Sequence, residues 1–253
     1  MTAPQPLSPV LFVGAGPGAA HHLTLGAFQA LQAADVVIHD RLVGPEIMAL
    51  IPATARLVDV GKEGFGPSTK QVEINAILVA HALTGARVVR LKGGDPGIFG
   101  RLDEEIDALE ANALPYDILP GLTSATVAAA SIGQSLTKRG RNATLRIVTG
   151  HDMAGFAEQD WRGLARAGEV AAIYMGKKSA RFIQGRLMMH GAAGDTPVTL
   201  VENVSRADQR VLATTLSALP DTAALCDGPV IILYGLAPRA AVLAIPALNE
   251  ATA

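Results

Sequence analysis

Short apolar runs that end in glycine or a polar residue alternate with amphipathic segments along the first half of the chain. Val10 to Val13 is apolar and leads into the glycine-rich stretch Gly14 to Gly18. Residues 23–33 then carry apolar side chains at helical spacing, and residues 35–40 form a second apolar run. Apolar runs of this length favour strands, whereas the 3.6-residue period favours a helix. The opening therefore predicts a βαβ unit with a glycine loop after its first strand.

The same alternation continues to about residue 124. We expect strands at residues 57–60, 88–91 and 116–119, and helices at 71–83 and 103–111. Several strands end in small or chemically functional residues. Ligands of open parallel sheets bind outside the carboxyl ends of the strands, so such residues are expected to share one rim. The expected rim consists of Gly14 to Gly18, Asp40, Lys62, Gly93 to Asp95, and Thr123 with Ser124.

The loop Gly93-Gly94-Asp95-Pro96 stops its strand most abruptly. Two adjacent glycines allow a positive φ or the close approach of a ligand, and a carboxylate at Asp95 can fix the turn by accepting hydrogen bonds. Taken alone, this loop is equally compatible with a tight strand-to-helix connection that binds nothing.

The second half of the chain has a different order and spacing of expected strands and helices. A helix rich in small residues is expected at 125–132, followed by a connection at 133–142 and strands at 145–149, 170–174, 198–202, 210–214 and 230–234. The short links between these strands favour a mixed sheet. We therefore expect two α/β domains, residues 1–132 with a mainly parallel sheet and residues 133–253 with a mixed one.

Composition narrows the class of protein. Apolar residues make up 49% of the 253 residues and charged residues 17%, as in compact globular domains. The formal net charge of -2 gives no general attraction for nucleic acid. The single cysteine, Cys226, excludes an internal disulfide framework. No apolar run is long enough to span a bilayer, and the N-terminus lacks the basic start of a signal peptide. We expect a cytoplasmic protein that binds neither membrane nor nucleic acid.

Several catalytic chemistries lack their motifs. The six histidines show no metal-binding spacing, so we expect no metal, and neither a nucleophile elbow nor a P-loop is present. A dinucleotide-binding fold remains an alternative because Asp40 could hold a ribose. However, Pro17 removes a backbone N–H from the first glycine loop, and that loop carries no cation or hydroxyl. A nucleoside without phosphates suits this loop better.

An ordered set of nine motifs makes the prediction of function specific. In chain order, the motifs are VGAGPG (13–18), HDRLV (39–43), VGK (60–62), VRLKGGDPGIFGR (89–101), PGLTSA (120–125), LTKRG (136–140), VTGHD (148–152), IYMG (173–176) and TPVTLVEN (196–203). With this set, the chain resembles the uroporphyrinogen-III C-methyltransferase family from about residue 10 to residue 236.

The resemblance implies transfer of methyl groups from S-adenosyl-methionine to C2 and C7 of uroporphyrinogen III, giving precorrin-2 and S-adenosyl-homocysteine, for sirohaem or cobalamin. It also implies the tetrapyrrole methylase fold, with the cofactor in a cleft between two α/β domains, and a homodimer. Asp40 matches the family's proton acceptor and Lys62 its proton donor. The residues that match its cofactor contacts are Pro17, Gly93, Gly94, Asp95, Ile98, Thr123, Ser124, Met175 and Val204, the last standing where relatives have glycine.

Carboxylates of the substrate need cations, and arginine forms the stronger charge-assisted bonds. The candidates are Arg41, Arg101, Lys138, Arg139 and Arg141, although the basic stretch 138–141 could equally be a solvated hinge. The chain departs from the family pattern at Gly97, Leu102 and Lys138, which concerns substrate packing more than methyl transfer. It also lacks the dehydrogenase and chelatase module of fused sirohaem synthases, so we expect the reaction to stop at precorrin-2.

Three alternatives remain open at this stage. A methylase of the same fold could act at another ring position. The βαβ start could belong to an NAD(P)-dependent oxidoreductase. A tetrapyrrole carrier without catalytic activity would share the binding residues but not the chemistry.

Overall fold

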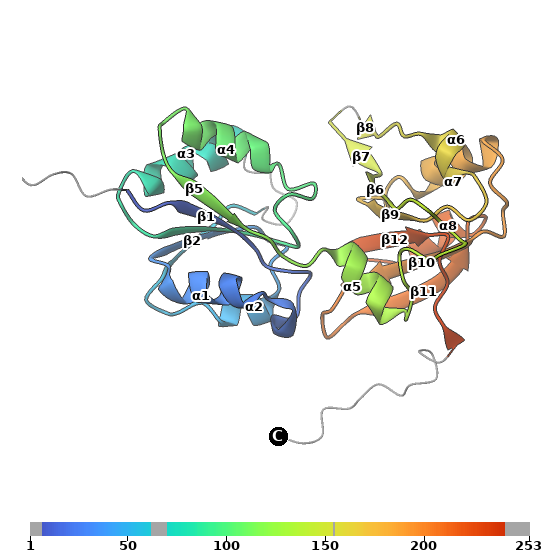
Figure 1. Ribbon diagram of the computed structural model, residues 1–253, viewed down its shortest axis with the longest axis horizontal. Helices are drawn as coiled ribbons and strands as arrows, with labels where there is room; N and C mark the ends of the chain where they lie inside the picture. Colours follow the sequence, from blue (N-terminus) through green and yellow to red (C-terminus); the bar gives the residue numbers. More distant parts are fainter. Residues whose placement is uncertain (1–6, 62–69, 154, 241–253) are drawn as a thin grey trace, which may run out of the picture. The chain divides into compact units, whose positions relative to one another are not determined.

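The computed structural model describes residues 7–61, 70–153 and 155–240, and the chain divides into two compact units (Figure 1). The units are Met1–Thr123 and Ser124–Ala253. Each contains a five-stranded sheet with helices, the first parallel and the second mixed. The predicted fold class, two α/β domains of these two kinds, is confirmed.

The first sheet has the strand order β3-β2-β4-β1-β5, with every pair parallel. Its strands are β1 (Val10–Gly14), β2 (Val36–His39), β3 (Arg56–Asp59), β4 (Val88–Lys92) and β5 (Tyr116–Leu119). The helices are η1 (Ala20–His22), α1 (Leu25–Ala33), α2 (Pro45–Ala49), α3 (Gln71–Ala82) and α4 (Leu102–Glu110).

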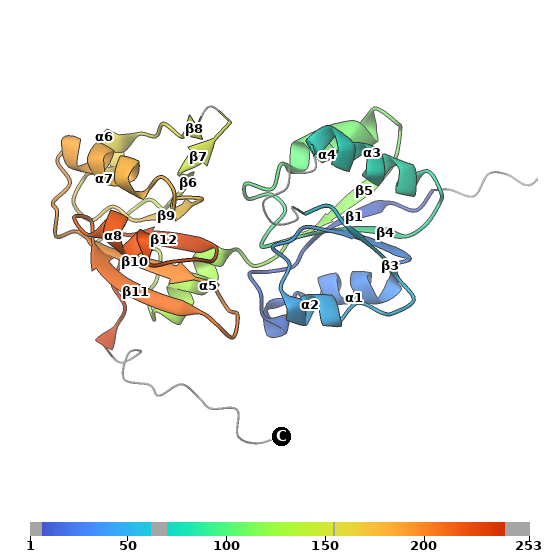
Figure 2. The same cartoon turned by 180° about the vertical axis from the view of Figure 1, so that it is seen from behind.

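Helices cover both faces of this sheet, α1 and α2 on one side and α3 and α4 on the other (Figures 1 and 2). Val89 and Leu91 pack in the cluster that contains Leu31 of α1. Val88 packs instead with Leu78 of α3 on the opposite face. Side chains of a strand alternate between faces, so Arg90 and Lys92 point to the same face as Val88, toward α3 and α4.

Local capping explains where α1 begins. The Oγ1 atom of Thr24 accepts a hydrogen bond from the N–H of Ala27 at 3.1 Å and so satisfies one backbone donor of the first turn. Residues 20–22 form a separate 3-10 turn. The helix predicted over 23–33 therefore starts at Leu25.

The second sheet has the order β11-β10-β12-β9-β6, and only its β6–β9 pair is parallel. Its strands are β6 (Arg146–Thr149), β9 (Ala171–Tyr174), β10 (Pro197–Glu202), β11 (Arg210–Thr215) and β12 (Val230–Tyr234), and a small hairpin pairs β7 (His151–Asp152) with β8 (Gly155–Phe156). The helices are α5 (Ser124–Ser131), α6 (Trp161–Leu164), α7 (Ala180–Met189) and α8 (Leu219–Ala224).

Helix α5 belongs to the second unit. Ala125, Ala128 and Ile132 are buried in one cluster with Val201 of β10 and Leu233 of β12. The chain therefore divides before α5 and not at the expected boundary between residues 132 and 133. For the same reason the segment 133–142, expected to connect the domains, lies within the second unit.

Candidate active site

The strands of the first sheet end in register. Gly14 at the end of β1 pairs with Lys92 at the end of β4, and Val13 pairs with Leu119 of β5. On the other side His39 of β2 pairs with Leu91 of β4. The loops that follow β1, β2, β4 and β5 therefore leave the sheet at one edge, its carboxyl edge. The structure thus brings the first-unit rim predicted from the sequence together, apart from Lys62, which lies outside the described residues.

The two glycine loops of this edge are bonded directly to each other. The N–H of Gly94 donates to the carbonyl of Gly16 at 2.8 Å, and the N–H of Gly16 donates to the carbonyl of Gly94 at 3.1 Å. Gly94 has φ +73°, and a Cβ atom placed on it would meet no atom within 4 Å. A residue other than glycine would be strained here and would fill space that lies open above the main chain.

A third backbone segment packs against these loops. A Cβ atom on Gly121 would lie 2.3 Å from the carbonyl oxygen of Gly94 and 2.8 Å from the Cα of Gly14. Only glycine permits this approach of the β5 loop to the β1 and β4 loops. We call the three segments 14–16, 93–95 and 120–121 the main-chain platform.

Asp95 holds the platform together. Its Oδ1 accepts a hydrogen bond from the N–H of Gly97 at 2.8 Å, and its Oδ2 accepts one from the N–H of Gly121 at 2.9 Å. The carboxylate thus both shapes its own turn and ties the β4 loop to the β5 loop.

Asp40 follows β2 at the same edge. Its Oδ1 accepts a hydrogen bond from Nη2 of Arg90 at 2.7 Å, and its side chain is 31% exposed. Its backbone N–H donates to the carbonyl of Leu91 at 3.3 Å. The carboxylate is therefore anchored by β4 at its main chain and at one oxygen, and it remains accessible to solvent.

Beneath Asp40 lies a buried ionic cluster of Arg90, Lys92 and Glu105. Glu105 accepts from Nε of Arg90 on Oε2 at 3.0 Å, from Nη2 of Arg90 on Oε1 at 3.0 Å, and from Nζ of Lys92 on Oε1 at 2.7 Å. The three residues are at most 3% exposed. Sequence reasoning missed this cluster. The available signal was a pair of cations at alternate positions of a strand whose other members are all apolar.

The electrostatics of the cluster differ between its two cations. Burial and repulsion from Arg90 lower the pKa of Lys92, and attraction by Glu105 opposes this only in part. Burial alone would lower the pKa of Arg90, but the carboxylates of Asp40 and Glu105 outweigh it and raise that pKa. Arg90 is therefore the fixed positive charge of the cluster.

The predicted substrate cations fall into different surroundings. Arg41 is exposed and lies against Gly61, where an added Cβ would come within 2.5 Å of its own Cβ. Arg101 is paired with Glu104, with Nε and Nη2 each 2.7 Å from a carboxylate oxygen. Lys138 and Arg139 are exposed in the second unit. The neighbouring Arg141 donates instead to the carbonyl of Ser135 at 2.7 Å, which makes it a brace of this loop.

Two predicted cofactor residues stand next to strained backbone in the second unit. Met175 directly follows β9, has φ +52° and is 51% exposed. Val204 follows β10 and is buried, between Asn203 with φ +51° and Ser205 with φ +60°. Non-glycine residues with positive φ persist only where the surrounding structure compensates for the strain, and they are found preferentially at functional sites.

The remaining predicted residues frame the platform or start the second unit. Pro17 is half-buried in the β1 loop, and the N–H of Ile98 donates to the carbonyl of Asp95 at 3.2 Å. Thr123 ends the first unit, and Ser124 begins α5. Among the described residues no group of three or more His, Cys, Asp or Glu side chains could hold a metal ion.

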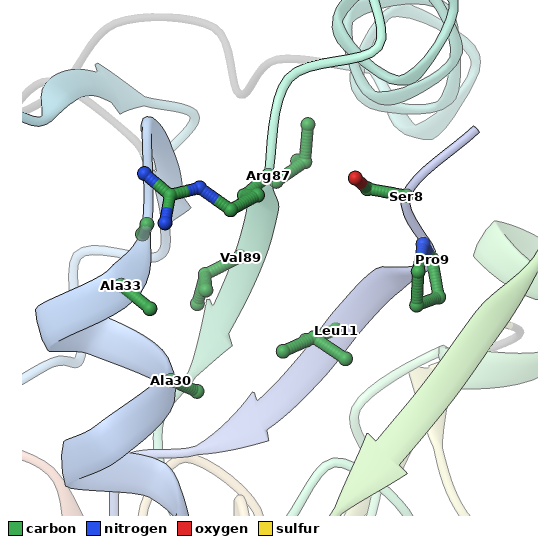
Figure 3. Close-up of a pocket in the computed structure, with 9 residues that line it drawn as sticks. Ser8, Pro9, Leu11, Ala30, Ala33, Arg87 and Val89 are labelled. Carbon is green, nitrogen blue, oxygen red and sulfur yellow. The ribbon is translucent and has the colours of Figure 1, made fainter. Parts of the chain in front are cut away.

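Two hollows accompany the first sheet. One of about 260 Å³ lies between α1 and the beginnings of β1 and β4 and is lined largely by apolar side chains (Figure 3). Because Ser8, Pro9 and Arg87 line it, it lies at the amino edge, away from the predicted site. The other, of about 280 Å³, is formed by the loop that follows the platform, from Pro96 to Glu104. It includes Gly97 and Leu102, where the chain departs from the family pattern.

No helix within the described ranges is long and apolar enough to cross a membrane.

Comparisons with known proteins bear on this site. The chain is 43% identical over 226 residues to siroheme synthase 3 of Aeromonas hydrophila, covering 89% of this chain and 48% of that protein. It is 45% identical over 233 residues to the siroheme synthase of Edwardsiella ictaluri, covering 92% of this chain and 50% of that protein. The chain thus spans about half the length of the curated relatives it matches.

Solved structures match over nearly their full length. The uroporphyrin-III C-methyl transferase of Thermus thermophilus, complexed with S-adenyl homocysteine, superposes with a TM-score of 0.78 at 34% identity, covering 90% of this chain and 97% of that one. A cobalt precorrin-4 methyltransferase has the same fold, with a TM-score of 0.79 at 24% identity, covering 90% of this chain and 94% of that one. The model of the tetrapyrrole (corrin/porphyrin) methylases matches residues 9–220. With this match across both units, the chain belongs to the tetrapyrrole methylase family.

Proposed function

We propose that this chain transfers methyl groups from S-adenosyl-methionine to C2 and C7 of uroporphyrinogen III, giving precorrin-2 and S-adenosyl-homocysteine. The proposal is supported by the Thermus thermophilus structure, of which the chain covers 97% and which contains S-adenyl homocysteine. It is also supported by the siroheme synthases that the chain matches over half their length. The observation that carries it is the main-chain platform at the carboxyl edge.

The platform suits this cofactor because it offers close main-chain approach without fixed cations. Gly94 leaves open space where a side chain would stand. The loops 14–18 and 93–95 contain no Lys or Arg that would favour a phosphate. We propose that the platform residues Gly93, Gly94 and Asp95, together with the neighbouring Pro17 and Ile98, hold S-adenosyl-methionine, with further contacts from Thr123, Ser124, Met175 and Val204.

When bound, S-adenosyl-methionine supplies a methyl group that its sulfonium charge already activates. The protein therefore needs to align an electron-rich pyrrole carbon more than it needs a nucleophile of its own. The ring carbon forms its bond to the methyl carbon while the bond from sulfur to that carbon breaks and its electron pair stays on sulfur. The methylated ring is then cationic, and loss of a proton restores its neutrality.

Asp40 is the residue proposed to take this proton. Its carboxylate is accessible and lies at the same edge as the platform, and a positioned carboxylate is a suitable general base. Lys62 is proposed as the proton donor. Arg41, Arg101, Lys138 and Arg139 are proposed to bind substrate carboxylates, with Arg101 exchanging its bond to Glu104 for one to the substrate.

The test is an anaerobic incubation with uroporphyrinogen III and S-adenosyl-methionine that carries a ¹³C-labelled methyl group. We expect two methyl groups per tetrapyrrole by mass spectrometry, at C2 and C7 by NMR. The Asp40→Ala variant should lower turnover roughly 10²- to 10⁴-fold, the usual range for loss of a general base, with little change in S-adenosyl-homocysteine affinity.

Other outcomes identify the alternatives. Methyl groups at other ring positions would indicate a different methylase of this family. Binding of NAD(P) without binding of S-adenosyl-homocysteine would indicate an oxidoreductase. Binding of uroporphyrinogen III without any methyl incorporation would indicate a carrier.

We further propose that the protein acts in the cytoplasm as a homodimer. Light scattering at micromolar concentration should give twice the mass of 26.1 kDa. A mass that stays at 26.1 kDa across concentrations would contradict the dimer.

A further inference from the structure

Four charged side chains from three elements meet below the carboxyl edge. Asp40 follows β2, Arg90 and Lys92 lie on β4, and Glu105 lies on α4. Two of them are cations and two are anions, so the group has no formal net charge when all are ionised. Asp40 alone among them is substantially exposed. The other three are the buried ionic cluster, which lies beneath the one accessible carboxylate.

We propose that Arg90 is a positioning residue for the reaction, which orients the Asp40 carboxylate as the proton acceptor, and that Glu105 and Lys92 fix Arg90 for this purpose. The inference rests on the proposed function, because it assigns Asp40 a proton-accepting role. Arg90 itself is buried, so it acts through Asp40.

The guanidinium of Arg90 has little freedom to move. Its side chain is 2% exposed, Nε and Nη2 both donate to Glu105, and Nη1 donates to the carbonyl of Leu91 at 3.3 Å. A planar guanidinium that is bound at every nitrogen presents its donors in a fixed direction. The bond from Nη2 to Oδ1 of Asp40 therefore starts from a rigid point.

Glu105 is held just as firmly. Besides the two bonds from Arg90, its Oε1 accepts a bond from Nζ of Lys92 at 2.7 Å and one from Nε2 of Gln71 at 3.3 Å. These contacts come from β4 and α3, so α4 cannot shift Glu105 without breaking several of them. The contacts that hold the buried ionic cluster therefore come from strand β4 and from helices α3 and α4.

Arg90 orients the Asp40 carboxylate by binding one of its two oxygens. Nη2 engages Oδ1, so Oδ2 is not tied to the guanidinium. The main chain at Asp40 is held to β4, because the N–H of Asp40 donates to the carbonyl of Leu91 at 3.3 Å. On the adjacent strand β3, Asp59 has its Oδ1 engaged by the N–H of Gly61 at 2.7 Å. In Asp40, therefore, Oδ1 sets the orientation of the carboxylate and Oδ2 is left to accept the proton.

The test is a double-mutant cycle between Arg90→Gln and Asp40→Ala, read as kcat and KM for methyl transfer to uroporphyrinogen III. Arg90→Gln should lower kcat roughly 10- to 100-fold, since misplacement of a catalytic group by about 1 Å costs this much, while the KM for S-adenosyl-methionine stays unchanged. Because Arg90 acts through Asp40, the same substitution should have no further effect in the Asp40→Ala background. Arg90→Lys should restore part of kcat.

Arg87→Gln is the matched control, because Arg87 lies just before the same strand and is half-exposed in an ion pair with Asp35. It should leave kcat unchanged. Equal losses of kcat for Arg90→Gln with and without Asp40 would show a merely structural role and overturn the proposal. If Arg90→Gln does not fold, Glu105→Gln, which keeps the side-chain shape, should show the same dependence on Asp40, and independent effects would again overturn it.

A structural readout separates this inference from the proposed function. Crystal structures of the wild type and of Arg90→Gln, or of Glu105→Gln where Arg90→Gln does not fold, each with S-adenosyl-homocysteine, should show a different Asp40 carboxylate orientation. The Arg87→Gln structure should show the wild-type orientation. An unchanged carboxylate in the variant would overturn the inference even if methyl transfer occurs. Failure of the wild type to methylate uroporphyrinogen III would instead contradict the proposed function, and the carboxylate orientations would still show separately whether Arg90 positions Asp40.

Discussion

At the scale of single residues, the candidate site depends on positions where a side chain is absent. Gly94 combines a positive φ with open space above it, and Gly121 allows one main chain to touch another. Asp95 is the exception, because its oxygens accept hydrogen bonds from two backbone N–H groups, one in its own loop and one in the β5 loop. The site is therefore formed more by the shape of the main chain than by side-chain chemistry.

The first prediction separates strain from ligand binding at Gly94. Gly94→Ala should reduce the free energy of unfolding by about 1 kcal/mol, because alanine resists φ +73°. It should also weaken the binding of S-adenosyl-homocysteine at least 10-fold, because the added methyl group enters the space assigned to the cofactor. Urea unfolding and calorimetry measure the two effects.

Gly85→Ala provides the control. Gly85 has φ +79°, and an added Cβ would likewise meet no atom within 4 Å, but it lies after α3 at the amino edge. It should lose similar stability and keep full affinity. Equal affinities for the two variants would contradict the placement of the cofactor over Gly94.

At the scale of secondary-structure elements, strand β4 connects the core to the site. Its residues alternate between an apolar face toward α1 and a mixed face that carries Arg90 and Lys92 toward α4. Both of its ends are fixed by charge, the carboxyl end by Glu105 and the amino end by Asp35. The two ends differ in exposure, so their ion pairs should differ in their contribution to stability.

The second prediction compares neighbouring carboxylates of α4. Glu105→Gln should reduce the free energy of unfolding by about 3–5 kcal/mol, because it leaves Arg90 and Lys92 buried without their shared anion. Glu104→Gln should cost at most about 1 kcal/mol, because Glu104 forms an exposed pair with Arg101. Urea unfolding of the two variants measures these losses. Equal losses of unfolding free energy would contradict the proposed contribution of the buried ionic cluster to stability.

The third prediction concerns the amino end of β4. Hydrogen bonds from the side chain and backbone of Arg87, together with its charge, lower the pKa of Asp35 from 3.8 to about 2. A depressed carboxyl pKa contributes stability that is present above the unfolded-state value and lost as the pH falls through the folded-state value. The stability difference between the wild type and Asp35→Asn should therefore be constant above pH 5 and disappear between about pH 4 and pH 2.

Thermal unfolding over this pH range measures the difference. Asp117→Asn serves as the comparison, because Asp117 is an exposed carboxylate on β5 whose Oδ1 accepts a hydrogen bond from the N–H of Ile118 on the same strand. A difference for Asp35→Asn that grows on acidification would have the wrong sign for this ion pair.

The elements themselves were largely predictable from the sequence, because apolar periodicity sets them locally. The glycine loops, Asp40 and Asp95 could be placed at one edge for the same reason, since parallel strands share a direction. The buried cluster could not be predicted. It requires the register that sets Arg90 beside Asp40 and the position of α4 that brings in Glu105, and both depend on pairing between distant segments.

The position of α5 was also beyond local pattern. Its small residues predicted a helix correctly, but the unit that it joins is decided by which core its face completes. Ala125 and Ala128 pack against the second sheet, so α5 starts the second unit. The role of each site residue, including Lys62 outside the described residues, stays a prediction.

At the scale of the whole molecule, charge distribution matters more than total charge. A net charge of -2 would repel a polycarboxylate substrate weakly, so binding must come from local cations. Lys138 and Arg139 form an exposed basic turn in the second unit, and Arg141 braces that turn through Ser135. The turn is thus held in shape while two of its cations remain exposed.

The fourth prediction tests whether this turn binds substrate or is a solvated loop. Replacing Lys138 and Arg139 together with Gln should raise the KM for uroporphyrinogen III roughly 5- to 150-fold, as expected for the loss of one or two charge-assisted contacts. The affinity for S-adenosyl-homocysteine should not change. Arg162→Gln, which removes an exposed arginine of α6, should leave the KM unchanged. Unchanged KM values in all variants would identify the turn as solvated.

The main-chain platform has a consequence for the evolvability of this protein. The cofactor is proposed to bind to the main chain of the platform. Substrate preference can therefore diverge through side chains that do not determine the conformation of the platform. The hollow from Pro96 to Glu104 offers such a position at Leu102. An engineer seeking a methylase for a different macrocycle would therefore vary Leu102 and leave Gly94, Asp95, Gly97 and Gly121 untouched, because the N–H of Gly97 binds the Asp95 carboxylate.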